Sequence, residues 1–289
     1  MRSISTLEGR SSASPGASAW ARRHATGEWN MESRVVDPGR GWKWIVEGFR
    51  LFLRSPAIWI ALVLILYMAM KVVQYVPLLA LVAVLLMPVF LAGLMDGCRA
   101  LEEGRRLEIA HLMKGFRRNP AQLVTIGGVS LVGNLAILMI VMAIGGDAFA
   151  TMAKTLAKSP TVTPQVAGEM QAATLEVTRA ALVGAAISLP LLMALWFAPL
   201  LTYFHDVKPW QALKSSFLAC LKNFLPFLVY GLVLLAALMV LVPVGIQFGQ
   251  YDLGLWLMAP VLLPSIYASY KDIYAARPAS AGRDSPLLG

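Results

Sequence analysis

The chain has 289 residues, of which 58% are hydrophobic and only 14% are charged. A soluble domain carries about 25% charged residues, so this composition argues against a soluble protein. The formal net charge is +9. The basic residues flank the apolar stretches, where they suit anionic lipid headgroups, and we therefore expect no nucleic-acid partner. Cys98 and Cys220 fall at span ends expected to face the reducing cytoplasm, which argues against a disulfide.

Residues 1–38 are rich in Ser, Ala, Gly and Arg and show no apolar periodicity, so we expect a disordered tail. A secretory signal is not expected, because no apolar stretch follows the arginines of this tail. Met31 is a second candidate start of translation. The expected membrane domain is 39–275, and a second disordered tail is expected at 276–289.

Six apolar stretches are each long enough to cross a bilayer, because a spanning helix needs about 20 mainly apolar residues. The stretches are continuous and do not alternate with polar residues, which predicts helices and not a β-barrel. The expected fold class is therefore all-α, a polytopic membrane protein with six transmembrane helices. The expected spans are 57–75, 77–97, 121–144, 179–201, 226–248 and 252–270.

The distribution of Lys and Arg predicts the orientation of the chain. Basic residues are concentrated in the N-terminal region, in the loops 98–120 and 202–225, and in the C-terminal tail. The loop 145–178 carries few of them. The positive-inside rule therefore places both termini and the two basic loops in the cytoplasm.

The loop 145–178 is the large external segment of this topology. Pro160 and Pro164 lie between stretches of Ala, Met, Leu and Glu, which favour helix. We expect two short helices joined by a turn at the prolines. Two interpretations remain open: a hairpin that rests on the membrane, or a solvated helical extension, which the composition favours.

A threefold internal repeat is the most specific pattern in the sequence. Each pair of spans follows an amphipathic segment in which apolar residues recur every three or four positions, as on one face of a helix. The expected apolar faces are Trp42, Ile45, Val46, Phe49, Phe52 and Leu53 in the first segment, Ile109, Leu112, Met113 and Phe116 in the second, and Trp210, Leu213, Phe217, Leu221 and Phe224 in the third. In the second segment we expect His111 to face water.

Proline and aspartate mark the spans in the same order in each copy. Proline suits the first turn of a helix, and Ser55 and Asn119 are expected to cap the turns that follow them. The opening prolines are Pro56, Pro120 and Pro226, and the closing pairs are Pro88 with Asp96, Pro199 with Asp206 and Pro264 with Asp272. The chain therefore reads as three copies, 41–98, 107–206 and 209–272, each a cytoplasmic interfacial helix followed by a membrane hairpin.

Three stretches carry a resemblance to known proteins: GWKWIVEGF at 41–49, MPVFLAGLMDGC at 87–98 and KGFRRNP at 114–120. They resemble an uncharacterised family of bacterial inner-membrane proteins, over about 31–275. The resemblance implies fold and location and no activity. More distantly, the hairpin repeat resembles the membrane domain fused to some glycerophosphodiester phosphodiesterases. The catalytic barrel of those enzymes is absent here, so no catalytic residue is carried over.

The candidate site residues are polar positions near or within the spans: Asp96, Asn134, His205, Asp206 and Asp272. The three aspartates would form a ring that binds a cation or a partner, or would serve as ordinary interfacial ion pairs, which we favour. The expected pairings are Asp96 with Arg99, Asp206 with Lys208, and Asp272 with Lys271 or an interfacial-helix cation. Asn134 lies at membrane depth, where a polar side chain more often joins helices than contacts a substrate.

Metal and cofactor sites are not expected. His205 and Asp206 are adjacent, and neighbouring side chains on a helix diverge by about 100°, so they do not chelate together easily. No metal-spacing, P-loop, nucleophile-elbow or dinucleotide motif occurs in the sequence. An enzyme would require Asp96, His205, Asp206 and Asp272 to meet in one polar pocket.

These observations favour a non-enzymatic inner-membrane protein that packs with lipid or with partner membrane proteins, a second copy included. The alternative is a transporter or channel for a lipid-like or small apolar molecule, because broken helices at matching repeat positions mark transport sites. The prolines expected to interrupt spans are Pro88, Pro190, Pro199, Pro243, Pro260 and Pro264. The lack of ionisable residues at mid-span weakens ion-coupled transport.

Overall fold

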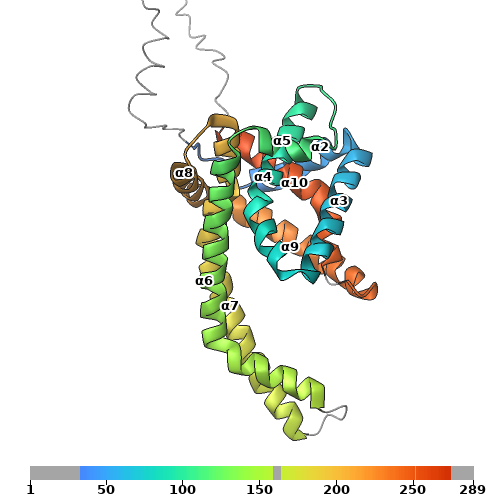
Figure 1. Cartoon of the computed structure of the whole chain (residues 1–289), viewed down its shortest axis with the longest axis vertical. Coiled ribbons are helices and arrows are strands. Elements are labelled where there is room, and N and C mark those ends of the chain that lie inside the picture. Colours follow the sequence, from blue (N-terminus) through green and yellow to red (C-terminus); the bar gives the residue numbers. More distant parts are fainter. Residues whose placement is uncertain (1–32, 159–163, 251, 275–289) are drawn as a thin grey trace, which may run out of the picture. The chain divides into compact units, whose positions relative to one another are not determined.

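The computed structural model describes residues 33–158, 164–250 and 252–274, and within these ranges every regular element is a helix (Figure 1). Six helices are long and apolar enough to cross a membrane, which confirms the all-α multi-span expectation. They are α3 (Pro56–Tyr75), α4 (Pro77–Glu102), α6 (Pro120–Lys158), α7 (Pro164–His205), α9 (Phe224–Gln247) and α10 (Leu253–Tyr274). The shorter elements are α2 (Arg40–Leu53), α5 (His111–Lys114) with the 3-10 turn η1 (Gly115–Arg117), and α8 (Pro209–Lys222).

The expectations for 1–32, including a start at Met31, and for 275–289 concern residues outside the described ranges. Residues 33–38, at the end of the expected N-terminal tail, contact the helices. The amide of Arg34 donates to the carbonyl of Ile273 at 3.1 Å. The amide of Val36 donates to Oδ1 of Asn223 at 2.9 Å. This short segment is therefore attached at two points to the helical domain.

The last span, α10, is the centre of the helical domain. Half of the residues in its most apolar stretch are buried inside the protein, against a third or fewer in the corresponding stretch of each of the other five spans. It packs against α2 and α9, and more lightly against α3 and α4. Its tyrosines Tyr267, Tyr270 and Tyr274 recur at helical spacing on the buried side. Because these rings fill the interior, α10 acts as the core, and α2, α3, α4 and α9 cover it.

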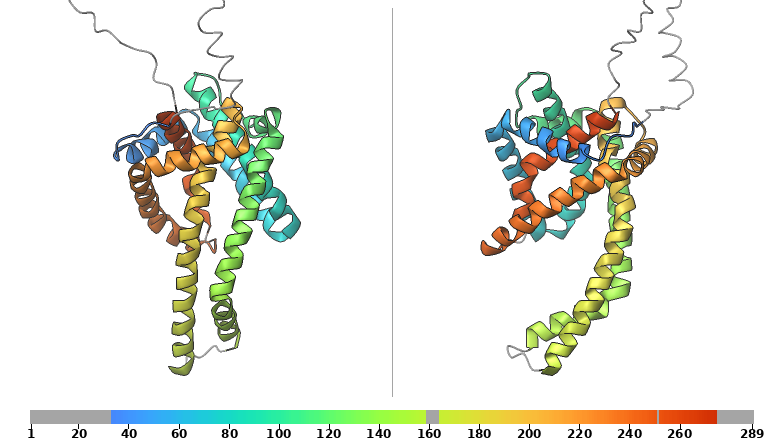
Figure 2. Two further views of the ribbon diagram at one scale, coloured as in Figure 1. Left: turned by 90° about the vertical axis from the view of Figure 1, so that its left-hand side faces the viewer. Right: turned by 180° about the vertical axis from the view of Figure 1, so that it is seen from behind.

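Each short helix packs against the second span of a hairpin: α5 and α8 against that of the preceding hairpin, and α2 against that of the last one. In chain order, α4 packs on α5, α7 packs on α8, and α10 packs on α2 (Figure 2). Glycine makes two of these contacts close. A Cβ added to Gly48 of α2 would lie 2.7 Å from Ser265, and one added to Gly115 would lie 1.9 Å from the carbonyl oxygen of Val89.

Helices α6 and α7 form the longest hairpin and run side by side (Figures 1 and 2). The described parts of 145–178 are helical, as expected, but the expectation of two separate short helices is wrong, because both segments continue the helices of the spans. The expected turn at Pro160 lies outside the described residues. At 1.5 Å per residue, α6 is about 60 Å long, roughly twice the hydrocarbon thickness of a bilayer. The hairpin is therefore long enough to leave the membrane on one side.

The expectation that prolines interrupt the spans is also wrong. Pro88 lies inside α4, Pro243 inside α9 and Pro264 inside α10, and each helix continues on both sides. The same holds for Pro190 and Pro199 in α7. Each proline removes one backbone donor without ending its helix.

The faces of the short helices differ from the expectation. In α2, Gly41, Trp44, Gly48 and Leu51 are buried, whereas the predicted stripe residue Trp42 is exposed. In α8 the buried residues are Ala212, Leu213, Ser216, Ala219 and Cys220, whereas Trp210 and Leu221 are exposed. A small-residue face thus packs on the protein, and much of the large apolar stripe points outward. Ser55 makes no side-chain cap bond to α3.

Candidate functional site

Asp272, near the end of α10, ties three segments of the chain together. Its side chain is 7% exposed. The carboxylate accepts hydrogen bonds from Nη2 of Arg34, at 2.6 Å, and from Nε of Arg40. The indole Nε1 of Trp44 donates to Oδ2 at 2.9 Å. Trp44 itself is completely buried. A carboxylate at this depth is stable only when it is paired and hydrogen-bonded, and the segment around α2 supplies both kinds of partner. Lys271, the other predicted partner, pairs with Glu102 instead.

Asp96, on α4, pairs with the segment that follows its hairpin. Nζ of Lys114 lies 3.1 Å from Oδ2 of Asp96 and 2.8 Å from Nε2 of His111. The predicted partner Arg99 bonds to Glu103 at 2.9 Å. The lysine therefore bridges a carboxylate and an imidazole.

His111 is buried, so the expectation that it faces water is wrong. Because Lys114 donates to Nε2, the ring is neutral and carries its proton on Nδ1, which lies 3.1 Å from the carbonyl of Glu108. Burial, with the positive charge of Lys114, lowers the pKa of His111. The ring therefore acts as a neutral acceptor.

Asp206 follows the end of α7 and lies beside the start of α6. Nη2 of Arg118 is 2.5 Å from Oδ2, and the amide of Asn119 donates to Oδ1. The hydrogen bond from Arg118 lowers the pKa of Asp206. The predicted partner Lys208 forms no ion pair within the described part of the chain. The side-chain amide of Asn119 donates to Asp206 and, at 3.3 Å, to the carbonyl of Thr202. It does not act as the expected helix cap.

The predicted polar residues do not meet in one pocket. Nε2 of His205 contacts the hydroxyl of Tyr270 at 2.5 Å, while the neighbouring Asp206 bonds to Arg118. Asp96 and Asp272 have separate sets of partners. In the described ranges no group of three or more His, Cys, Asp or Glu side chains is arranged to hold a metal ion. These polar residues therefore join helices at several separate points.

Sequence reasoning missed several residues that build this end of the protein. Asn223 is completely buried, and its Nδ2 donates to the carbonyls of Arg34 at 3.0 Å and Ala219 at 2.9 Å. Trp44 was not assigned to any face. Its spacing from Gly41 and Gly48 was the available signal, because an aromatic residue between glycines at helical spacing is typical of a close helix contact.

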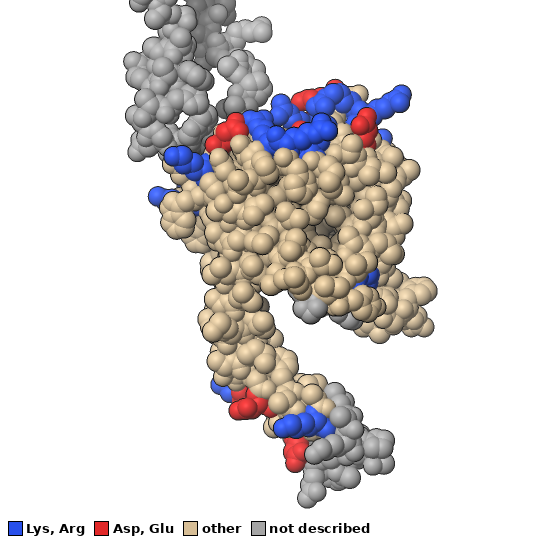
Figure 3. All heavy atoms as spheres, in the orientation of Figure 1, with Lys and Arg blue, Asp and Glu red and all other residues tan. Residues whose placement is uncertain are grey.

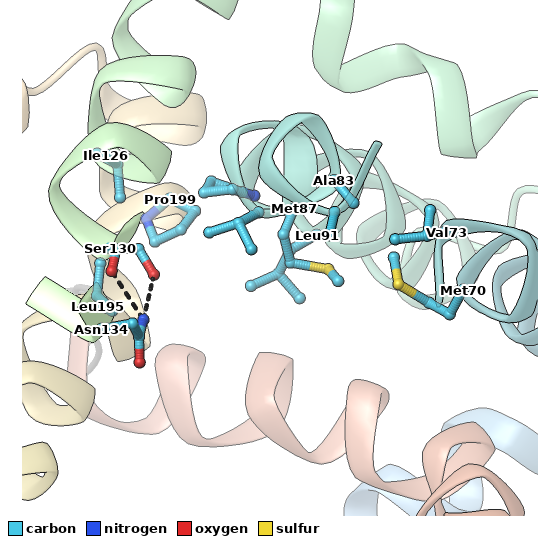
Figure 4. A pocket seen from close by; sticks show the side chains of 13 residues that line it. Met70, Val73, Ala83, Met87, Leu91, Ile126, Ser130, Asn134, Leu195 and Pro199 are labelled. Atoms are coloured by element: carbon cyan, nitrogen blue, oxygen red, sulfur yellow. Dashed lines mark hydrogen bonds between the residues drawn. The ribbon is translucent and has the colours of Figure 1, made fainter. Parts of the chain in front are cut away.

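Asn134 bonds within its own helix. Its Nδ2 donates to the carbonyl of Ser130 at 2.7 Å and to the hydroxyl of Ser130 at 3.2 Å. The expected bond to another helix is not among its contacts. Both residues line a groove of about 390 Å³ between α3, α4, α6 and α7 (Figure 4). Pro88 and Pro199 line the same groove, which is otherwise apolar.

A second groove of about 530 Å³ lies between α7, α8 and α9. Its walls are almost entirely leucine and aromatic side chains. The backbones of α7 and α9 stay apart beside it, and the two helices meet through aromatic rings, such as those of Trp196 and Phe227. Trp196 and Cys220 line it. Burial raises the pKa of the Cys220 thiol to about 12. Cys98 and Cys220 are both free and buried.

Most charged side chains are gathered at one end of the helical domain, and a smaller group lies toward the far end of the α6–α7 hairpin (Figure 3). The ion pairs of Asp96, Asp206 and Asp272 all lie at or near the ends of membrane spans. A smaller polar group is found at the opposite end of α3, where Nζ of Lys71 lies 2.9 Å from Asp252 and 2.7 Å from Gln250. Apolar side chains separate the two groups, as in a protein that crosses a bilayer.

Comparison with known proteins supports this architecture. No family model matches the chain, and no solved structure matches it. A protein of Burkholderia thailandensis named as a probable inner membrane protein is 30% identical over 273 residues, which cover 86% of this chain and 95% of the relative. With six spans and this similarity over nearly the full length of both chains, the protein belongs to the family of that probable inner membrane protein and is a multi-pass protein of the inner membrane.

Proposed function

We propose that this protein is a non-enzymatic component of the inner membrane that packs with lipid and with other membrane proteins, with α2, α5–η1 and α8 lying at the cytoplasmic interface. The observation that supports this proposal most strongly is the set of aromatic side chains exposed on the outer face of the short helices. Trp42 and Phe49 of α2 and Trp210 of α8 are exposed beside basic residues. Aromatic side chains next to Lys and Arg are typical of helices at the headgroup level.

The spans themselves offer little surface to anything but lipid or another apolar helix. Large apolar side chains point outward from all six, and the membrane window of α9 is only 6% buried. In water such a surface would aggregate, whereas in a bilayer it is the ordinary exterior. The polar residues at the span ends are engaged in helix-joining pairs, which supports a packing role.

The repeated packing supports three copies of one unit. The second span of each hairpin packs on the short helix of the next copy, and α10 of the third copy packs on α2 of the first. The three contacts thus form a closed cycle. A threefold repeat explains why the same Pro and Asp pattern ends α4, α7 and α10.

Site-specific labelling tests the placement. Arg106 lies in the basic loop and Glu169 in the α7 extension, and both are exposed, whereas the native cysteines are buried. A membrane-impermeant maleimide should label the variant Glu169→Cys in spheroplasts, and should label Arg106→Cys only after permeabilisation. The reverse pattern would contradict the orientation. The packing role predicts that mild detergent extraction retains lipid or a partner. A bare monomer in every mild detergent would oppose it.

The groove at Asn134 favours a second candidate, a carrier for a lipid-like or small apolar molecule. The groove places one polar pair, Ser130 and Asn134, among apolar walls that include Pro88 and Pro199. A few polar groups in an apolar pocket of this size are typical of ligand sites. Liposomes containing the protein should then move a fluorescent lipid between leaflets faster than empty liposomes, and the variant Asn134→Leu should slow the movement. Equal rates in loaded and empty liposomes would oppose this function.

A further inference from the structure

We propose that the groove between α7 and α9 binds an acyl chain of an anionic phospholipid, whose headgroup is held by the lysines of α8. The inference rests on the proposed placement in the membrane with α8 at the cytoplasmic interface. It adds a defined lipid site to that placement.

The first step of the argument is the gap between the backbones of α7 and α9. In the cycle of hairpins, the second span of one copy faces the first span of the next. Between α4 and α6 this contact is tight, and a Cβ on Gly127 would lie 2.2 Å from the carbonyl oxygen of Leu85. Helices α10 and α3 also touch, whereas the backbones of α7 and α9 stay apart and the two helices meet through the rings of Trp196 and Phe227, 5.8 Å apart. The groove of about 530 Å³ occupies this gap.

The second step is the size of the occupant. A helix with side chains is about 10 Å wide, so 20 Å of it would fill roughly 1,600 Å³, three times the groove. Water is a poor occupant, because the lining offers almost no polar partners. An extended alkyl chain matches both the volume and the leucine-rich walls. The groove lining on α9 runs from Phe224 to Leu238, about 21 Å along the helix axis.

The third step is an unpaired donor. Trp196 lines the groove, and its Nε1 is buried without an acceptor among the described residues. Buried N–H groups are nearly always paired. An ester carbonyl at the head of an acyl chain is the acceptor that a phospholipid would bring, whereas a plain alkane has none. Trp196 therefore favours a glycerolipid.

The fourth step is the charge at the groove end. Cys220 is the residue of α8 that lines the groove, and α8 contains no acidic residue. Lys208, Lys214 and Lys222, on and beside α8, are exposed and form no ion pair within the described ranges. The cations that contact the aspartates, such as Arg40, Lys114 and Arg118, are paired, whereas the lysines of α8 have positive charge left for a ligand. Unpaired lysines at the interface attract anionic headgroups.

Gly231 allows a direct test. It lines the groove, and a Cβ at this position meets nothing within 4 Å. The variant Gly231→Phe should therefore fill the groove without distorting the fold. Gly168 of α7 also has open space around it and does not line the groove, so Gly168→Phe is the matched control.

The full chain is purified in mild detergent, offered phosphatidylglycerol or phosphatidylcholine, and examined by native mass spectrometry. The parent protein and Gly168→Phe should each retain phosphatidylglycerol, and Gly231→Phe should retain at least tenfold less. The pair Lys214→Gln and Lys222→Gln should reduce the preference for phosphatidylglycerol over phosphatidylcholine. Retention by Gly231→Phe equal to the parent overturns the site, and an unchanged preference in the lysine variants overturns the headgroup assignment.

Three further outcomes separate this inference from the proposed function. If Gly231→Phe disrupts a dimer and no lipid is bound in the parent, a second copy occupies the groove and the lipid site is wrong. If maleimide labelling gives the expected orientation and no lipid is retained, the groove inference fails while the membrane placement stands. A reversed orientation removes the placement itself.

Discussion

Asn119 and Asp206 are hydrogen-bonded to each other, and they are the non-glycine residues with left-handed backbone in the described ranges, with φ of 53° and 57°. Asn119 precedes α6 and Asp206 follows α7. The bond therefore closes the base of the longest hairpin where the chain enters and leaves it. A left-handed conformation costs a non-glycine residue about 1–2 kcal/mol, which Asn and Asp tolerate best because their side chains bond locally.

The variants Asn119→Gly and Asn119→Ala should separate strain from hydrogen bonding. Both lose the bond to Asp206, but glycine relieves the left-handed backbone and alanine does not. We expect Asn119→Ala to lower the free energy of unfolding by about 1 kcal/mol more than Asn119→Gly. Unfolding by SDS in mixed micelles measures the difference. Equal losses would show that the backbone at 119 relaxes without cost.

Removal of the Asp272 carboxylate should be the most damaging single change at the span ends. Asp272→Ala leaves Arg40 and the indole of Trp44 without their acceptor, and breaking such a buried pair costs about 3–5 kcal/mol. The control is Arg179→Ala, which breaks an exposed pair with Glu176 at 2.8 Å and should cost less than about 1 kcal/mol. Similar losses in the two variants, measured by the same unfolding titration, would contradict the structural role of Asp272.

Gly115 should not tolerate a methyl group. A Cβ there would lie 1.9 Å from the carbonyl oxygen of Val89, which belongs to the backbone of α4 and cannot rotate away. We expect Gly115→Ala to destabilise the protein by about 1–3 kcal/mol. Gly168→Ala, where the added atom meets open space, should be neutral or stabilising by up to about 1 kcal/mol. Thermal unfolding in detergent compares the two, and an unaffected Gly115→Ala protein would refute the close packing.

Mild acid should weaken the protein through His111. Its pKa is lowered in the folded state, so the unfolded chain binds the proton first as the pH falls below about 6.5. Stability should therefore be complete above this pH and decline below it. The ring faces Lys114, Asp96 and Glu108, and protonation would oppose Lys114. His111→Asn should flatten the dependence of the melting temperature between pH 5 and 7. An unchanged slope would assign the effect to another group.

The six spans could be predicted because lipid imposes a simple condition, about 20 apolar residues in succession. The expected and observed spans agree closely for α3 and α9. The extensions of α6 and α7 were not predicted, because hydropathy reports only the part of a helix that meets lipid. Residues 148–158 and 164–178 are helical for reasons of propensity and of packing between the two helices.

The partners of Asp96 and Asp206 were mispredicted for a different reason, whereas Asp272 has an expected kind of partner, the α2 residue Arg40. Arg99 and Lys208 are the nearest cations in sequence, whereas the observed partners Lys114 and Arg118 come from another element. Charge pairing depends on tertiary packing, which sequence distance does not report. His111 was misplaced in the same way. Its polar character suggested water, but the close approach of α5 to α4 at Gly93 and Gly115 buries it.

The position of α10 at the centre has a consequence for biosynthesis. It is the least apolar of the six spans and the most buried, and it comes last in the described chain. When the ribosome has made α2, the surface that will cover Gly41, Trp44 and Gly48 does not yet exist. The amphipathic helix must therefore wait at the translocon or on the bilayer surface until some two hundred further residues are inserted, roughly ten to forty seconds at ordinary elongation rates. A premature stop ahead of Leu253 would leave the preceding helices without the span that they pack around. We expect quality-control proteases to degrade such an incomplete protein.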